Sequence, residues 1–374
     1  MKTLLVTMDF PPFLGGIANY YFNRVSKIET REIVVLMNRV SECPVLASIR
    51  QSSRSGSKCQ SKVYYKNFFT SLIWPHWLPL IWHVARAVKR EKIEMIWVGQ
   101  VLPVGSAVWV VSKILQLRDP STPLRSAQDD KKLKFFVTCH GNDLIRAKSV
   151  ARKYKLAKKI LKNAEYVEAN TEFTKNILIQ DFGIASDKIK IVYPECTLSK
   201  DMVNKEKVEE LRTKYGLAGK KVLLTVARLV ESKGIEQVVK AFSKVSQEMP
   251  GLVYLVVGDG PDKKRLINQV GTGLDLSLQD KIIFTGNVSH DELPNYYALS
   301  DAFILTPRKN VGTGLQPVRD TESFGIVYLE ALEFGLPVIA GDTGGVREVK
   351  NDKIVLVDSE DVEEIAEELI KVMK

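Results

Sequence analysis

Two cations after a predicted strand could bind a charged ligand. Arg228 and Lys233 stand five residues apart in Ala-Arg-Leu-Val-Glu-Ser-Lys-Gly, downstream of the apolar run Val222–Val226. Lys233 comes just before a predicted helix, whose N-terminal end carries a partial positive charge. Together the two cations could clamp a pyrophosphate. An exposed salt-bridging pair is the alternative, but the position after a strand favours anion binding.

Two glutamates form the strongest local pattern. Glu322 and Glu330 stand eight residues apart in Glu-Ser-Phe-Gly-Ile-Val-Tyr-Leu-Glu, and Glu322 is expected to precede a helix that contains Glu330. Carboxylates hydrogen-bond sugar hydroxyls, and the amides of Ser323, Phe324 and Gly325 could bind phosphate. Two solvated surface glutamates are the alternative. The helix is instead expected to be buried through its apolar residues, Ile326, Val327, Leu329, Ala331 and Leu332, and a buried glutamate is rarely without a role.

Two loops in the first half also follow predicted strands. The loop Asp9–Gly16 ends in two glycines before a helix at about Ile17, so it predicts either an anion site at the helix N-terminus or a simple tight turn. It lacks G-x-G-x-x-G, so a dinucleotide site is a weak interpretation. His140 follows the strand Phe135–Cys139 and is expected to face a ligand crevice. A structural histidine is the alternative.

Short β-rich runs alternate with helical patterns along the whole chain. This alternation predicts βαβ units and parallel sheets with both faces covered, an α/β fold. The expected strands are Thr3–Thr7, Ile33–Met37, Met95–Val98, Phe135–Cys139, Tyr166–Ala169, Lys190–Tyr193, Val222–Val226, Val253–Val257, Ile282–Thr285, Ala302–Leu305, Pro337–Ala340 and Ile354–Val357.

A chain of 374 residues is too long for one ordinary core and predicts two domains. Pro194 follows a strand, and a charged helix and a glycine-containing turn come before the next strand. We therefore expect an N-terminal domain at 1–194, a linker at 195–216 and a C-terminal domain at 217–374, both doubly wound.

Composition excludes several classes of protein. No apolar run is long enough to span a membrane, and the N-terminus lacks the length of a signal peptide, so a cytoplasmic protein is expected. The four cysteines show no C-x-x-C spacing, which argues against zinc and a disulfide framework. The net charge of +10 allows a polyanionic substrate or an anionic membrane surface. Nucleic acid ranks last because no recognition motif is present.

The motifs, in order, resemble those of glycosyltransferase family 4, retaining enzymes with the two-domain GT-B fold. The resemblance covers nearly the whole chain through F-P-P-x-x-G-G-I, H-G-x-D, R-x-x-x-x-K-G, V-G-D-G-P, G-x-V and E-x7-E. The opening, the segment Trp74–Pro79 and G-I-V-Y-L-E-A look like the phosphatidylinositol-mannoside mannosyltransferase branch. The resemblance implies two Rossmann-like domains, the N-terminal one binding the acceptor and the C-terminal one the sugar nucleotide.

The resemblance assigns residues to the nucleotide part of the donor. Gly16 would let its loop approach the phosphates, and Arg228 and Lys233 would neutralise the leaving diphosphate. Val288, in Gly-Asn-Val after a predicted strand, would meet the base through its backbone. Glu330 would bind the ribose hydroxyls.

It also assigns residues to the transferred sugar. His140 would contact and orient the sugar, and Glu322 would bind its hydroxyls. The amides of Phe324 and Gly325, with Ser323 beside them, would lie near the sugar or phosphate. No metal or other cofactor is expected, because fixed cations can stabilise the leaving group and the chain has no D-x-D motif.

The resemblance therefore implies a hexosyltransferase that moves mannose from GDP-mannose to a lipid-linked or glycan hydroxyl. A UDP-sugar transferase, a sugar-nucleotide epimerase and a catalytically inactive binding module stay as alternatives. The segment Phe68–Arg90 contains Trp74, Trp77 and Trp82 together with basic residues. It predicts either one helix that lies at the inner face of an anionic membrane or a core helix.

Two features depart from the family pattern. The loop Thr306–Gly314 is longer and more basic than in many relatives. The sequence ends at Lys374, where relatives usually continue with a helix that crosses back to the N-terminal domain, so this strap is expected to be omitted or cut short.

Overall fold

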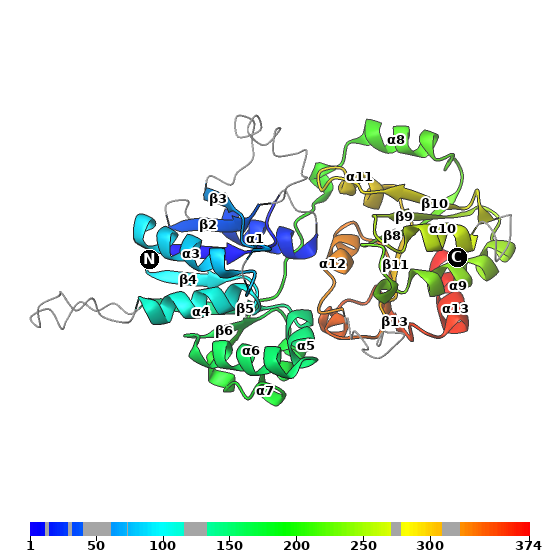
Figure 1. Cartoon of the computed structure of the whole chain (residues 1–374). Helices are drawn as coiled ribbons and strands as arrows, with labels where there is room; N and C mark the ends of the chain where they lie inside the picture. The colour runs from blue at the N-terminus through cyan, green and yellow to red at the C-terminus, as the bar shows by residue number, and fades with distance from the viewer. Residues whose placement is uncertain are drawn as a thin grey trace, which may run out of the picture. The chain divides into compact units, whose positions relative to one another are not determined.

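The contacts of the chain divide it into two compact units, Met1–Tyr193 and Pro194–Lys374 (Figure 1). Each unit is a parallel α/β sheet with its own core. The computed structural model describes residues 1–11, 15–28, 32–39, 61–72, 74–115, 133–270, 278–308 and 322–374.

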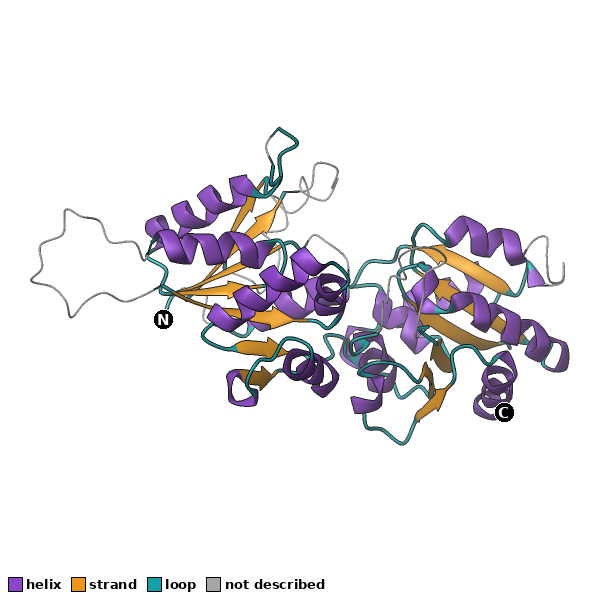
Figure 2. Cartoon of the chain, turned by 60° about the horizontal axis from the view of Figure 1, so that its bottom comes forward, coloured by secondary structure: helices purple, strands orange, loops and turns teal. Residues whose placement is uncertain are grey.

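The first unit contains a seven-stranded sheet in the order β3-β2-β1-β4-β5-β6-β7. Its strands are β1 (Thr3–Thr7), β2 (Ile33–Asn38), β3 (Lys62–Lys66), β4 (Met95–Val98), β5 (Lys134–Cys139), β6 (Val167–Ala169) and β7 (Ile189–Ile191). The connecting helices, which Figure 2 shows packed along the sheet, are α1 (Gly16–Ser26), α3 (Leu78–Glu91), α4 (Val104–Ile114), α5 (Asn142–Lys148), α6 (Ala151–Asn163) and α7 (Glu172–Gln180). All neighbouring strands run parallel, so their carboxyl ends share one edge.

The second unit contains a six-stranded parallel sheet in the order β10-β9-β8-β11-β12-β13. Its strands are β8 (Lys221–Val226), β9 (Leu252–Val257), β10 (Ile282–Gly286), β11 (Ala302–Leu305), β12 (Val338–Gly341) and β13 (Ile354–Val357). Its helices are α8 (Lys205–Lys214), α9 (Ile235–Glu248), α10 (Lys263–Gln269), α11 (Leu293–Ala298), α12 (Ile326–Glu333) and α13 (Val362–Met373).

Apolar residues cover both faces of the second sheet. Leu223 packs into a cluster with Phe242 of α9 and Leu369 of α13. Its neighbour Leu224 packs into a separate cluster with Tyr328 of α12. Successive strand side chains point to opposite faces, so a strand covered on both sides is a continuous apolar run.

The twelve predicted strands are all present, and the α/β fold class is confirmed. The predicted strand Lys190–Tyr193 is displaced, because β7 ends at Ile191. Strand β3 was not predicted. It is an edge strand whose residues Lys62–Lys66 are exposed or half-buried, so it lacks the continuous apolar pattern by which the others were found.

The segment 195–216, which was predicted to be a linker, groups with the second unit. It contains helix α8, and the side chains of Val208 and Leu211 are buried beside Leu217 in that unit's core. Its apolar positions at helical spacing therefore give it a packed face.

The expected tryptophan-bearing helix begins later than predicted. Helix α3 starts at Leu78, so Trp74 and Trp77 precede it and only Trp82 lies on it. The proline at position 79 suits the first turn of a helix, and Pro75 disfavours helical backbone at Trp74. No helix in the described part of the chain is long and apolar enough to cross a membrane.

The contact between Gly234 and Thr306 offers a test of how tightly the second sheet is packed. A methyl group at Gly234 would lie 1.8 Å from the Thr306 carbonyl oxygen, whereas one at Gly219, which has the same φ of 68°, would meet no atom within 4 Å. We expect Gly219→Ala to cost about 1 kcal/mol of unfolding free energy from backbone strain alone. We expect Gly234→Ala to cost at least about 3 kcal/mol, because the backbone must also move.

Urea unfolding of the two variants measures this difference. Equal losses in the two variants would contradict the close contact.

Candidate functional site

The structure brings Lys233 and Glu322 together at the carboxyl end of the second sheet. Lys233 ends the short turn Glu231–Lys233 between β8 and α9, and Glu322 lies four residues before α12, as predicted. The distance from Lys233 Nζ to Glu322 Oε2 is 2.5 Å. The side chains are only 26% and 14% exposed, so this ion pair is shielded from solvent on most sides.

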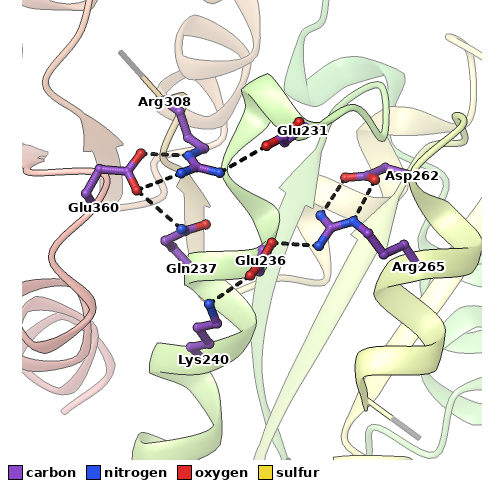
Figure 3. Close-up of polar contacts among 8 residues, drawn as sticks. All are labelled: Glu231, Glu236, Gln237, Lys240, Asp262, Arg265, Arg308 and Glu360. Atoms are coloured by element: carbon purple, nitrogen blue, oxygen red, sulfur yellow. Dashed lines mark hydrogen bonds and ion pairs between the residues drawn. The ribbon is translucent and has the colours of Figure 1, made fainter. Parts of the chain in front are cut away.

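A network of charged side chains fixes the turn that carries Lys233 (Figure 3). The Arg308 guanidinium donates to both carboxylate oxygens of Glu360, at 2.7 and 3.0 Å, and lies 3.4 Å from Glu231. The Arg308 backbone N–H also donates to the carbonyl of Ser232 at 3.0 Å. The chain after β11 therefore holds the turn through Arg308, and Glu360, before α13, holds the Arg308 side chain in place.

A second, separate group of charged side chains lies on α9 and at the start of α10. Arg265 donates to Asp262 at 2.8 Å and to Glu236 at 2.6 Å, and Lys240 donates to Glu236 (Figure 3). These side chains are more exposed than Glu322. Exposed ion pairs contribute little to the stability of a fold. We assign this group a link between α9 and the start of α10 and no part in the candidate ligand site.

Arg228, the other predicted cation, lies on the same loop but apart from the ion pair. It is exposed and forms no ion pair with a described residue. The loop is anchored beside it, because the buried Leu229 donates its backbone N–H to the carbonyl of Asp259 at 3.0 Å. The charge of Arg228 is therefore not neutralised by a described residue.

Val288 follows β10 at the same edge of the sheet. Its half-buried side chain packs against the cluster that contains Tyr296. The structure thus places the predicted base-contacting residue two strands from β8, with β9 between them.

Glu330 is buried in the described fold, with 3% of its surface exposed. The Tyr297 hydroxyl on α11 donates to Glu330 Oε2 at 2.8 Å. Burial raises the pKa of the Glu330 carboxyl to about 7, although the tyrosine hydrogen bond opposes this shift. Helix α12, which contains Glu330, is less buried than predicted. Only Tyr328, Glu330 and Ala331 are fully buried on it.

The segment between the two glutamates is tightly packed. Phe324 is buried, and Gly325 has a φ of 81°. A Cβ atom at Gly325 would lie 2.3 Å from the ring of Tyr328. Only glycine therefore fits at position 325, where the segment Ser323–Gly325 leads into α12.

His140 in the first unit lies against helix α1. Its Nε2 is 2.7 Å from the hydroxyl of Tyr21, and the rings of Tyr20 and Tyr21 meet it edge-on. Helix α1 begins at Gly16, so Tyr20 is about 6 Å farther along its axis. The structure therefore brings the predicted glycine loop and the predicted histidine to one helix; residues 12–14 of that loop lie outside the described part.

The side chain of Asp143 fixes the backbone at His140, and burial keeps the imidazole neutral. The amides of His140 and Leu144 both donate to Asp143 Oδ1 at 3.0 Å. Burial, with a smaller effect of Arg24, lowers the pKa of His140 to about 4. Burial raises the pKa of Asp143 to about 6. His140 is therefore uncharged at neutral pH.

An ion pair between a half-buried arginine and a buried glutamate in the first unit was not predicted. Arg24 of α1 contacts both oxygens of Glu168 at 2.5 and 3.1 Å, and the Thr138 hydroxyl donates to Glu168 at 2.8 Å. The Arg24 guanidinium also lies 4.4 Å from the centre of the Trp97 ring. A glutamate inside the apolar strand Val167–Ala169 was the sequence signal that could have revealed it.

Three further polar residues were also missed: Tyr21, Asp143 and Tyr297. Asp143 stands in the H-G-x-D motif and could have been found there. Among the described residues, no cluster of three or more histidine, cysteine, aspartate or glutamate side chains could hold a metal ion.

The raised pKa of Glu330 predicts a pH-dependent stability. A carboxyl whose pKa is about 7 when folded, against 4.5 when unfolded, contributes stability that is fully present below pH 4.5 and lost as the pH rises through 7. Relative to Glu330→Gln, the wild-type protein should lose about 2–3 kcal/mol of unfolding free energy between pH 5 and pH 8.

Urea unfolding of both proteins at the two pH values measures this loss. Other titrating groups are common to both proteins and cancel. A constant difference between them would show that the Glu330 carboxyl is not perturbed.

The two units match two family models. Residues 15–195 match the model described as Glycosyltransferase Family 4, and residues 207–374 match the model described as Glycosyl transferases group 1. The chain is 26% identical over 366 residues to a GDP-mannose-dependent alpha-(1-6)-phosphatidylinositol monomannoside mannosyltransferase of Mycolicibacterium smegmatis, covering 97% of this chain and 86% of the relative. It is 27% identical over 382 residues to the enzyme of the same name from Mycobacterium tuberculosis, covering 100% and 89%.

Solved structures show the same architecture. HepE of Anabaena, in complex with UDP and glucose, aligns with a TM-score of 0.75 at 18% identity, covering 100% of this chain and 90% of that one. Sucrose-phosphate synthase of Thermosynechococcus elongatus aligns with a TM-score of 0.72 at 18% identity, covering 99% and 89%. The fold, the two family models and the full-length relatives place the chain in glycosyltransferase family 4, as a hexosyltransferase with the GT-B fold that is similar to the phosphatidylinositol-mannoside mannosyltransferases.

Proposed function

We propose that this glycosyltransferase transfers mannose from GDP-mannose to a hydroxyl of a glycolipid acceptor, with retention at the anomeric carbon. The observation that carries the proposal is the shielded Lys233–Glu322 ion pair at the strand exits of the second unit. It offers a cation for a leaving diphosphate and a carboxylate for sugar hydroxyls. The names of the full-length relatives support mannose and GDP as parts of the donor.

The proposed chemistry rests on charge that develops as the nucleoside diphosphate departs. Lys233 and Arg228, which forms no ion pair with a described residue, would stabilise this charge, and fixed cations do so without reorganisation. Glu322 would accept hydrogen bonds from the sugar, and Glu330 from the ribose. The amides of residues 323–325, the Gly16 loop and Val288 would contact the rest of the donor. No step in this scheme requires a metal ion.

A transferase that uses a UDP-sugar is the second candidate. The structural neighbour HepE was crystallised in complex with UDP and glucose, and the proposed base contact through the backbone of Val288 involves no side chain that selects guanine over uracil. A sugar-nucleotide epimerase and an inactive binding module are further alternatives, which product analysis with and without acceptor would separate.

Thermal unfolding in the presence of GDP, UDP, ADP and their sugar conjugates, without added metal, tests the donor. We expect selective stabilisation by GDP and GDP-mannose, about 2.7 kcal/mol at a ligand concentration one hundred times the Kd.

Lys233→Ala should slow sugar transfer, because it removes about 2–4 kcal/mol of transition-state stabilisation. Lys240→Ala removes a half-buried lysine on the neighbouring helix and should transfer normally.

The outcomes separate the candidates. Stabilisation by UDP compounds alone would show that the donor is a UDP-sugar and would leave the proposed enzyme class unchanged. The absence of any shift, or wild-type transfer by Lys233→Ala, would remove this ion pair from the donor site.

An exposed apolar surface in the first unit suits a lipid-linked acceptor. Leu72 is 90% exposed, Trp74 82% and Trp82 58%, and the Arg86 guanidinium lies 5.3 Å from the centre of the Trp82 ring. Tryptophan beside basic residues is typical of membrane interfaces. We therefore propose peripheral docking of this surface on an anionic membrane, at the cytoplasmic face.

Sedimentation with phosphatidylglycerol-containing vesicles at low salt tests the docking. The double variant Leu72→Ser, Trp74→Ser should bind at least about tenfold more weakly, because it removes about 3 kcal/mol of apolar burial. Ile267→Ser, which removes a 43% exposed residue of the second unit, is the control and should bind normally. Equal binding of all three proteins, or no binding by the wild type, would contradict the proposal.

A further inference from the structure

The hydroxyl of Tyr21 is shared between two neighbours. Tyr21 is fully buried on α1, and its hydroxyl lies within hydrogen-bond distance of the Gly99 carbonyl oxygen and of His140 Nε2. A tyrosine hydroxyl has one proton to donate, and a carbonyl oxygen can only accept. The Tyr21 proton therefore goes to Gly99, and the tyrosine oxygen is left to accept a hydrogen bond from His140.

The acceptor in this chain of hydrogen bonds is fixed by the backbone. Gly99 follows β4, and its N–H donates to the carbonyl of Val6 at 2.8 Å. A Cβ atom at Gly99 would lie 2.7 Å from the side chain of Thr7. The carbonyl of Gly99 is thus held by strands β1 and β4 and is not free to turn away from Tyr21.

These contacts select one tautomer of His140. With the proton on Nε2, every group in the chain Nε2–H, Tyr21 hydroxyl and Gly99 carbonyl has a partner. With the proton on Nδ1, both Nε2 and the Gly99 oxygen would need the single Tyr21 proton, and one buried acceptor would lack a donor. Nδ1 has no hydrogen-bond partner among the described residues.

We propose that Tyr21 is a positioning residue that keeps His140 as the Nε2–H tautomer, so that Nδ1 accepts a hydrogen bond from a hydroxyl of the transferred sugar. The sugar contact rests on the proposed function, whereas the tautomer does not. The edge-on contacts of Tyr20 and Tyr21 with the imidazole, at 5.3 and 5.4 Å between ring centres, hold the ring in this orientation. The helix that begins at the glycine loop thereby also sets the hydrogen-bonding pattern of His140.

Nitrogen NMR of the unliganded full chain tests the tautomer. The chain has four histidines, so protein labelled with ¹⁵N-histidine gives few signals, and His140→Gln identifies those of His140. We expect a protonated Nε2 and an unprotonated Nδ1 in the wild type. In Tyr21→Phe the two nitrogen shifts should move toward each other as the tautomers mix.

The matched control is Tyr154→Phe. The Tyr154 hydroxyl, on α6, donates to the carbonyl of Asp181 at 2.6 Å, so this variant also loses a tyrosine-to-carbonyl hydrogen bond. It should leave the His140 signals and the transfer rate unchanged, whereas Tyr21→Phe should slow transfer about 3- to 10-fold. A protonated Nδ1 in the wild type, or wild-type His140 shifts in Tyr21→Phe, would overturn the role of Tyr21.

Donor addition tests the sugar contact separately. GDP-mannose or UDP-glucose should move the Nδ1 signal of His140, and GDP or UDP alone should not. If a sugar nucleotide binds and the Nδ1 signal does not move, the sugar contact is wrong. If no nucleotide binds at all, the proposed function and the sugar contact both fail, while the tautomer measured in the unliganded protein still decides the role of Tyr21.

Discussion

The close approach of Gly234 to the backbone of Thr306 determines the geometry of the second unit's site. No side chain fits between them, so the end of β11 lies directly against the turn that precedes α9. The charged contacts of Arg308 with Glu231 and Glu360 then fix the turn from outside. Lys233 is consequently held at the sheet edge by a rigid backbone, which is what a site for a developing charge requires.

Burial shifts the pKa values of the two principal buried groups in opposite directions. It lowers the pKa of His140 to about 4 and raises that of Glu330 to about 7, because a low-dielectric interior disfavours the charged form of either group. His140 is therefore a neutral hydrogen-bonding group throughout the physiological range. Glu330 changes charge near neutrality, and hydroxyls that donate to it would favour its ionised form.

The sequence predicted the strands well, because doubly covered strands such as β9 are continuous apolar runs. It also predicted the positions of His140, Lys233 and Glu322, since a parallel sheet brings the residues after its strands to one edge. It could not predict the partners of these residues. Tyr21 is separated from His140 by 119 residues, and Arg24 from Glu168 by 144, so no local pattern reports their contact. Strand β3 was missed because its edge position leaves it without an apolar pattern.

In the proposed donor site, the Lys233–Glu322 pair would couple recognition of the two parts of the donor. In the unliganded chain the carboxylate neutralises the lysine, so a diphosphate that binds Lys233 must replace that contact. A shielded carboxylate without a partner is unfavourable, so a nucleoside diphosphate alone would leave Glu322 in an unfavourable state. A sugar nucleotide also brings hydroxyl donors to Glu322 and restores its hydrogen bonds. On this argument the pair would favour the intact donor over the diphosphate product, and the sugar and the leaving group would be recognised together.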